Sequence, residues 1–370
     1  MYGEGERIRM PRRVEEPPGD PGVERSSPLC HRYHGFVLGQ CLALAFMPAG
    51  RARFADRAAG MRECLADLGL GAQAAWLPET PPDPGGASHA ALLTRLLPYL
   101  AARSRELAEF AVLGGVLIHY GLVVAEDPAA AAAILTEIDR LRATYDLPPI
   151  EPASLVLAAG ERDADVVGPS LAYLREILLR LPSEPDTALV LIPSAIGLTD
   201  AYERFARPAL ADCGYRAFRP WACFTPEDDA ALTLALIDRS GFVWADLSDA
   251  DPALFHAIGA AHALGRRTAL VARADRAAAP STLGGDPVIR YDPADADWPA
   301  SAVPLMAACL AALELAAERG ERLRVTPGPI ARVFDDVSHA LRHVLLPAAI
   351  EAAEAAIADA GDPPPPTARR

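Results

Sequence analysis

Residues 245–265 read ADLSDADPALFHAIGAAHALG, and this stretch decides the fold class of the chain. It starts at the end of the apolar run Phe242–Asp246, which is typical of a buried strand, and continues into Pro252–Leu264, which predicts a helix. Together with Asp246 at the end of the strand, the turn between them holds three aspartates and a serine. Its last residue, Asp251, precedes a proline, which is the order expected of a helix N-cap. A buried strand that enters a helix through a polar turn is the repeating unit of a parallel α/β sheet.

The same unit recurs on both sides of this stretch. Short apolar runs bounded by turn residues predict five strands, at Ala188–Ile192, Tyr215–Pro220, Phe242–Asp246, Thr268–Ala272 and Val288–Tyr291. Helical segments separate the first four of them, at Asp200–Cys213, Pro226–Ser240 and Pro252–Leu264. We therefore predict an α/β domain over residues 186–325, with a flavodoxin-like or Rossmann-like parallel sheet of about five strands.

The rest of the chain has a different pattern. Leucine and alanine at helical spacing predict an all-α helical bundle over residues 29–150, followed by a linker and connecting helix over 151–185. Residues 1–28 form a predicted disordered leader, and 363–370 form a proline-rich tail. A C-terminal helix is predicted within 326–362. Two roles stay open for that helix, covering the bundle or forming a homo-oligomer contact.

Composition excludes several classes of function. A formal net charge of -14 is wrong for a protein that neutralises nucleic-acid phosphates, so we expect no nucleic-acid partner. Six cysteines without a CxxC pair indicate neither a zinc site nor a disulfide framework, and we expect a reducing cytoplasm. His339 and His343 stand four residues apart, but no third ligand has a defined spacing to them, so no metal site is predicted.

Two apolar runs bear on membrane association. Phe36–Met47 is too short to span a bilayer, and Phe110–Ala125 is marginal in length and contains three glycines and a histidine. The first 28 residues hold no apolar stretch of the secretory kind. We therefore interpret both runs as buried helices, and we expect a cytoplasmic protein without a membrane partner.

The opening stretch resembles a segment of nucleoside 2-deoxyribosyltransferase-like proteins, a group related to TIR-like and SLOG-like nucleotide-binding domains. That segment reads approximately ADLTGRNPNVFYELGLAHALGKP. It aligns without gaps on Ala245 to Ser248, on Asp251-Pro252, on Phe255-His256, on Gly259 and on Ala261 to Gly265. The resemblance covers about residues 187–292. It implies a domain that binds a small nucleotide or nucleoside derivative, in bacterial signalling or defence.

The resemblance also implies where the ligand binds. The expected binding residues lie beyond the carboxyl ends of the strands and around the following helix: Pro193, Ser194, Asp246, Ser248, Asp251, Phe255, His256 and Gly259. The family places its catalytic glutamate at the position of Ala257, and alanine has no oxygen with which to attack an anomeric carbon. For Asp246, Ser248 and Asp251, a local role in the turn or as helix cap remains the alternative to ligand binding.

Three hypotheses follow for the function. The first is a sensor or regulatory protein, a pseudoenzyme that binds a nucleotide derivative without transferase chemistry. The second is an active nucleoside or NAD N-glycosyl hydrolase or transferase that uses Asp246, Asp249 or Asp251 as its carboxylate. The third is a non-catalytic scaffold that acts through the helical bundle. The chain has no GxGxxG, P-loop or GxSxG pattern, and we predict no cofactor.

Overall fold

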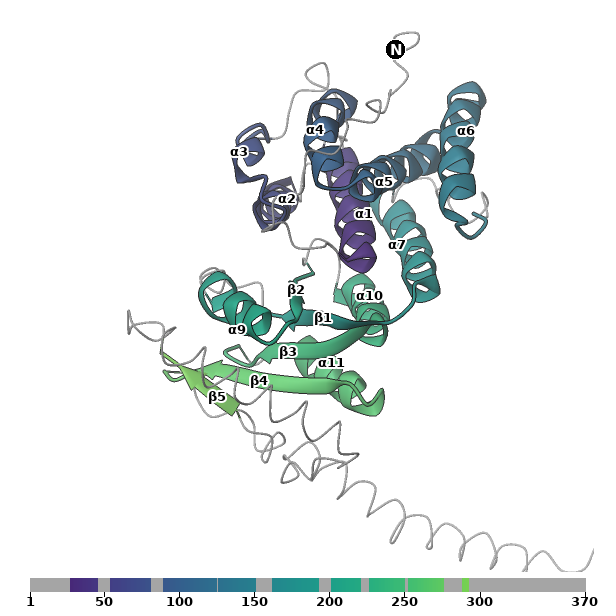
Figure 1. Cartoon of the computed structure of the whole chain (residues 1–370). Helices are drawn as coiled ribbons and strands as arrows, with labels where there is room; N and C mark the ends of the chain where they lie inside the picture. The colour runs from purple at the N-terminus through teal and green to yellow at the C-terminus, as the bar shows by residue number, and fades with distance from the viewer. Residues whose placement is uncertain are drawn as a thin grey trace, which may run out of the picture.

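The computed structural model contains a helical N-terminal region followed by a parallel sheet (Figure 1). The structure describes residues 27–45, 54–80, 89–124, 126–150, 162–192, 201–220, 226–249, 252–275 and 288–292. The expected leader, C-terminal helix and proline-rich tail lie outside these ranges. The helices before the sheet are α1 (Pro28–Ala45), α2 (Phe54–Asp67), α3 (Gly71–Ala74), α4 (His89–Arg103), α5 (Arg105–Val123), α6 (Pro128–Tyr145) and α7 (Arg162–Arg180).

Strands and helices alternate in the second half of the chain, as the sequence predicts. The elements are β1 (Glu184–Leu191), the π-helix η3 (Tyr202–Ala206), α9 (Arg207–Asp212), β2 (Arg216–Phe218), α10 (Pro226–Arg239), β3 (Ser240–Asp246), α11 (Pro252–Ala263), β4 (Arg267–Arg273) and β5 (Val288–Tyr291). The strands form one sheet in the order β2-β1-β3-β4-β5, and every pairing is parallel. This is the flavodoxin-like order, so the predicted α/β class is confirmed.

Alternating side chains give the sheet two covered faces. Leu189, Val243 and Leu270 point into a large apolar cluster that also contains buried residues of α1, α5, α7, α10 and α11. Val190 and Trp244 point the opposite way, into a smaller cluster that η3 and α9 cover. Burial on both faces explains why the strands are continuous apolar runs instead of alternating polar and apolar residues.

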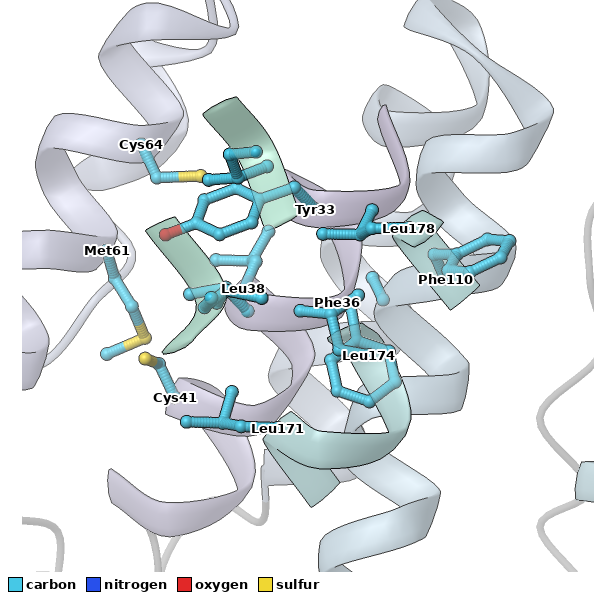
Figure 2. Packing of buried hydrophobic residues seen from close by; sticks show 14 of the residues in the cluster. Tyr33, Phe36, Leu38, Cys41, Met61, Cys64, Phe110, Leu171, Leu174 and Leu178 are labelled. Atoms are coloured by element: carbon cyan, nitrogen blue, oxygen red, sulfur yellow. The ribbon is translucent and has the colours of Figure 1, made fainter. Parts of the chain in front are cut away.

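Helix α1 is the centre of the larger cluster. Its side chains contact Met61 and Cys64 of α2 on one side, and Phe110 of α5 and Leu174 of α7 on the other (Figure 2). The same cluster continues into the sheet through Phe218 of β2, whose ring packs edge-on against Tyr33 of α1 with 5.4 Å between centroids. The N-terminal helices and the sheet therefore share one apolar core.

The crossing of α1 and α5 depends on glycine. A methyl group added to Gly39 would lie 1.9 Å from the backbone oxygen of Ala111, and one added to Gly114 would lie 2.1 Å from that of Phe36. No side chain fits at these distances, so only glycine permits the two backbones to approach so closely. Helix α5 is also the one described helix that is long and apolar enough to cross a membrane, but 72% of its apolar window is buried within the protein.

Polar contacts also join α1 to the sheet. The backbone N–H of Leu29, in the first turn of α1, donates to Oε1 of Glu184 at 3.0 Å, and Thr187 of β1 donates to Oε2 of the same carboxylate. One turn further along α1, Nε2 of His34 donates to the backbone oxygen of Arg219, just after β2, at 3.1 Å. A buried carboxylate at a helix N-terminus stabilises the helix dipole, so Glu184 holds α1 on the sheet.

The predicted boundaries differ from the observed ones mainly at β1, β2 and η3. Strand β1 starts at Glu184, four residues earlier than predicted, because its pairing with β3 continues through a register shift. Strand β2 ends at Phe218 and not at Pro220, because proline has no N–H for a sheet ladder. The helix predicted at Asp200–Cys213 includes a π-helical turn over Tyr202–Ala206, which local sequence patterns do not reveal.

Candidate functional site at the carboxyl edge of the sheet

The strand order defines one place where the sheet changes direction. The chain passes from β1 outward to β2 on one side, and from β3 outward to β4 on the other. The order therefore reverses between β1 and β3, and the carboxyl edge at such a switch point is where open α/β sheets bind their ligands. Strand β1 ends there at Leu191, and β3 ends there at Asp246. The candidate site is therefore the carboxyl edge of the sheet at the ends of β1, β2 and β3.

At this edge, Asp246 accepts hydrogen bonds from three donors within the described part of the chain. Its Oδ1 accepts hydrogen bonds from the backbone N–H and from the hydroxyl of Ser248, the first at 2.9 Å. Its Oδ2 accepts a bond of 2.7 Å from the hydroxyl of Tyr291, which ends β5. The Ser248 hydroxyl in turn accepts from the backbone N–H of Arg273 at 2.9 Å. Asp246, Ser248 and Tyr291 thus form a buried cluster, here called the Asp246 network, that connects the ends of β3, β4 and β5.

Burial and hydrogen bonding have opposite effects on this carboxylate. Burial raises the pKa of Asp246, while the hydrogen bonds from Ser248 and Tyr291 lower it. Burial also raises the pKa of Tyr291 well above its usual range, and the nearby Asp246 charge adds to this. Tyr291 therefore stays protonated and donates its hydrogen at neutral pH.

The Asp246 network supports a structural role for two predicted ligand contacts. The bond from the Ser248 N–H to the Asp246 side chain is a local turn bond, which is the alternative role considered from sequence. Asp246 has no exposed surface, and Ser248 is buried. Both side chains position the turn after β3, and their oxygens bond to groups within the protein.

The other predicted site residues are distributed around α11. Asp249 is half-buried in the turn, and His256 is exposed on the helix. Phe255 is half-buried and packs against the larger apolar cluster. A methyl group added to Gly259 meets no described atom within 4 Å, so packing among the described residues does not require glycine there. Pro193, Ser194 and Asp251 lie outside the described residues.

Ala257 is part of the core. It is 5% exposed and lies on the buried face of α11 with Leu254, Ile258 and Ala261. All four belong to the larger apolar cluster. A glutamate at this position would place its carboxylate among apolar side chains of the described core.

Three residues of this edge are not among those predicted from sequence: Tyr202, Arg219 and Tyr291. The guanidinium of Arg219 lies over the Tyr202 ring, 4.8 Å from its centroid, and 3.5 Å from Oε2 of Glu63 on α2. Phe205, on the same π-helix as Tyr202, packs against the rings of Trp244 and Tyr291. The π-helix therefore lies between the Arg219 side chain and the Asp246 network.

A sequence signal existed for one of the three. Arg219 follows the predicted second strand closely, and carboxyl-end loops are where ligand contacts are expected. The predicted strand runs two residues past the observed end, which puts Arg219 inside the sheet. Tyr202 and Tyr291 had no local signal, because their partners are 17 and 45 residues away in sequence.

Among the described residues, no group of three or more His, Cys, Asp or Glu side chains could hold a metal ion. Comparisons with protein-family models, with curated proteins and with solved structures found no match to this chain. The fold and the site define the class, a parallel α/β protein with flavodoxin-like strand order and a polar carboxyl edge.

Proposed function

We propose that this protein binds a small nucleotide or nucleoside derivative at the carboxyl edge, between the ends of β1 and β3, and acts as a sensor or regulatory protein. The observation that carries the proposal is the strand order β2-β1-β3-β4-β5, which puts the switch point of the sheet beside the turn that begins at Asp246. The resemblance of residues 245–265 to deoxyribosyltransferase-like proteins supports this class of ligand. In this proposal the sheet domain is a divergent relative of that family.

The residues at the edge favour binding over glycosyl chemistry. A retaining glycosidase needs a carboxylate that can reach the anomeric carbon. Both oxygens of Asp246 accept hydrogen bonds and the residue has no exposed surface, so an attack would require the Asp246 network to break. Ala257 offers no oxygen. Asp249 is the accessible acidic side chain of the described turn, and it can accept hydrogen bonds from ribose hydroxyls or base amino groups.

The contacts of Arg219 support a regulatory role. The loop after β2 begins with this residue, which touches α1 through its carbonyl and α2 through its guanidinium. A ligand that changes the position of this loop would therefore change contacts with the N-terminal helices. A sensor requires two conformations for which the ligand has different affinities. Contacts of one loop with both the ligand site and the N-terminal helices would couple binding to such a change.

The test is a binding screen with the full-length protein. Thermal denaturation is measured with deoxynucleosides, nucleotides, NAD and cyclic nucleotides, and stabilising ligands are titrated by calorimetry. Saturation at a hundred times Kd should stabilise the protein by about 2.7 kcal/mol. We expect Asp249→Asn to weaken binding of the stabilising ligand. Glu137→Gln, which removes the same charge from an exposed ion pair on α6, should have no effect.

Two outcomes would contradict the proposal. If no ligand of the panel stabilises the protein, the scaffold hypothesis is left. If the protein releases free base from a bound ligand, and Asp249→Asn abolishes the release, the protein is an enzyme and not a sensor. Base release is followed by chromatography under the conditions of the binding titration.

A further inference from the structure

We infer that helix α7 is hinged at Gly168-Pro169 and that its first part, Arg162–Val167, opens away from α1 while the rest of the protein stays folded. The inference concerns the helical region and is independent of the proposed ligand. It uses three features of the contact between α1 and α7: two buried polar side chains without partners, a break in the hydrogen bonding of α7, and an uneven distribution of apolar side chains along α7.

The side chains of Gln40 on α1 and Ser170 on α7 carry the first part of the argument. Both residues have no exposed surface. Among the described residues, neither the oxygen and nitrogen of the Gln40 amide nor the hydroxyl of Ser170 has a hydrogen-bond partner. A buried polar group without a partner is unfavourable, because it has lost its hydrogen bonds with water and gained none. Both groups therefore favour any movement that brings water to them.

These two side chains lie at the same level of the helix pair. Helix α7 ends at Arg180, four residues before Glu184, and the Glu184 carboxylate accepts the N–H of Leu29 in the first turn of α1. The two helices therefore run side by side in opposite directions (Figure 1). Gln40 lies eleven residues beyond Leu29, and Ser170 lies ten residues before Arg180. At the helical rise these separations are about 16 Å and about 15 Å from the sheet end of the pair.

The helical period also puts them on facing sides of the two helices. Phe36 of α1 and Leu174 of α7 belong to the apolar cluster between these helices (Figure 2). Gln40 lies one turn beyond Phe36 on the same side of α1, and Ser170 lies one turn before Leu174 on the same side of α7. Separation of the helices at this level therefore gives water access to both polar groups.

The backbone of α7 is interrupted at the same level, and this observation is independent of the side chains. Gly168 and Pro169 are the seventh and eighth residues of the helix, directly before Ser170. Proline has no N–H for the carbonyl four residues earlier, and its ring disfavours a straight helix. Glycine before it adds backbone freedom, and sharp helix kinks occur at such positions. The weakest point of the α7 backbone is therefore beside the two unpartnered side chains.

Apolar packing is uneven on the two sides of this point. The part of α7 after the hinge contributes four buried aliphatic side chains to the larger cluster, Leu171, Leu174, Ile177 and Leu178. Before the hinge, Val166 and Val167 are the side chains of the described part that join the cluster. Segments with few buried apolar contacts open at the lowest free energy. The first part of α7 is therefore the part that opens.

The experiment measures how often position 170 becomes exposed in the full-length protein. In the variant Ser170→Cys, alkylation of the new thiol is followed over time by mass spectrometry of peptides, without any ligand. The native thiol of Cys64 on α2, which has no exposed surface, reports global unfolding of the same molecules. We expect the thiol at position 170 to react roughly ten- to a hundredfold faster than Cys64, because it needs only local opening.

Two further substitutions test the cause of the opening. Gln40→Leu replaces the unpartnered amide by an apolar side chain of similar size, and Pro169→Ala restores the missing N–H of α7. Each should slow alkylation at position 170 by about three- to tenfold. Each should also raise the Tm of the otherwise unchanged protein by roughly 2–4 °C. Gln73→Leu, on the short helix α3, is the control and should leave the alkylation rate unchanged.

Equal alkylation rates at position 170 and at Cys64 would overturn the inference, since α7 would then open only when the whole protein unfolds. Faster alkylation and a lower Tm in Gln40→Leu would also overturn it, because the amide would then hold a stabilising hydrogen bond in the closed protein. If circular dichroism shows that Ser170→Cys does not fold, the Tm values of Gln40→Leu and Pro169→Ala decide. An increase in both supports the inference, and any other result contradicts it.

Discussion

Replacement of Tyr291 by phenylalanine tests whether the Asp246 network is structural. The substitution removes one hydroxyl, which donates a 2.7 Å hydrogen bond to the buried carboxylate of Asp246, and it leaves the ring contact with Phe205 in place. A hydrogen bond to a charged group contributes about 1.5–3 kcal/mol. Because Asp246 has no exposed surface, water does not replace the lost donor, and we expect the upper half of this range.

The assay is urea denaturation, supported by thermal denaturation. For a folded unit of 150–250 residues the expected loss corresponds to a decrease in Tm of roughly 5–12 °C. The lost bond favours the charged form of Asp246, so Tyr291→Phe should raise the pKa of this group further above its usual value. The cost of the substitution should therefore be largest at neutral pH. It should shrink in acid, where Asp246 becomes protonated in both proteins.

Tyr99→Phe is the matched control. Tyr99 is 41% exposed on α4, and removal of its hydroxyl should change the free energy of unfolding by less than about 0.5 kcal/mol. The structural role would be refuted if Tyr291→Phe unfolds like the wild type while its affinity for the stabilising ligand falls. In that case Tyr291 and Asp246 would contact the ligand directly.

Three further predictions concern the core and the charge state. Gly39→Ala should destabilise the protein by at least about 1–3 kcal/mol in urea denaturation, because the added methyl would meet the Ala111 oxygen at 1.9 Å. Gly259→Ala is the control and should be neutral or stabilising by up to about 1 kcal/mol. If the two substitutions changed the free energy of unfolding equally, the close approach of α1 and α5 at Gly39 would be contradicted. Ala257→Glu should lower the free energy of unfolding by more than about 2 kcal/mol, since its carboxylate would enter the core, and the variant should release no base. Hydrolysis by this variant would show instead that the position faces an open pocket. Burial lowers the pKa of His31 and His119 to about 4 and of His34 to about 3, so the folded state binds fewer protons than the unfolded state below pH 6.5. Stability should therefore fall between pH 7 and pH 5, by roughly 1–2 kcal/mol per histidine, and His34→Gln should reduce this fall; a flat profile would contradict the burial of these side chains.

The elements of the sheet domain could be predicted because their signals are local. Val288–Tyr291 was predicted with the observed bounds, since a short apolar run between turn residues reads as a buried strand wherever it pairs. Helix α11 begins at Pro252, as the aspartate-proline order predicts. The predicted bounds are wrong at β2, where Arg219 and Pro220 follow the strand in sequence but do not join the ladder.

The candidate site could be predicted only in part. The turn after β3 is visible in sequence, because three aspartates and a serine stand where a strand ends and a helix begins. The sequence does not show that Asp246 and Ser248 use their oxygens within the protein, because the deciding donor, Tyr291, is 45 residues further along the chain. The Ala257 position was noted from the resemblance, but its burial in the core depends on the helices that cover the sheet.

The sequence by itself therefore determined the elements, their order along the chain and the α/β class. These follow from the periodicity of apolar residues and from capping and turn residues, which act within a few positions. The tertiary structure decided the strand order, the continuity of the core from α1 into the sheet, and the stacking of Arg219 on Tyr202. Those features depend on contacts between residues far apart in sequence, and such contacts form and stabilise the protein only when the chain folds.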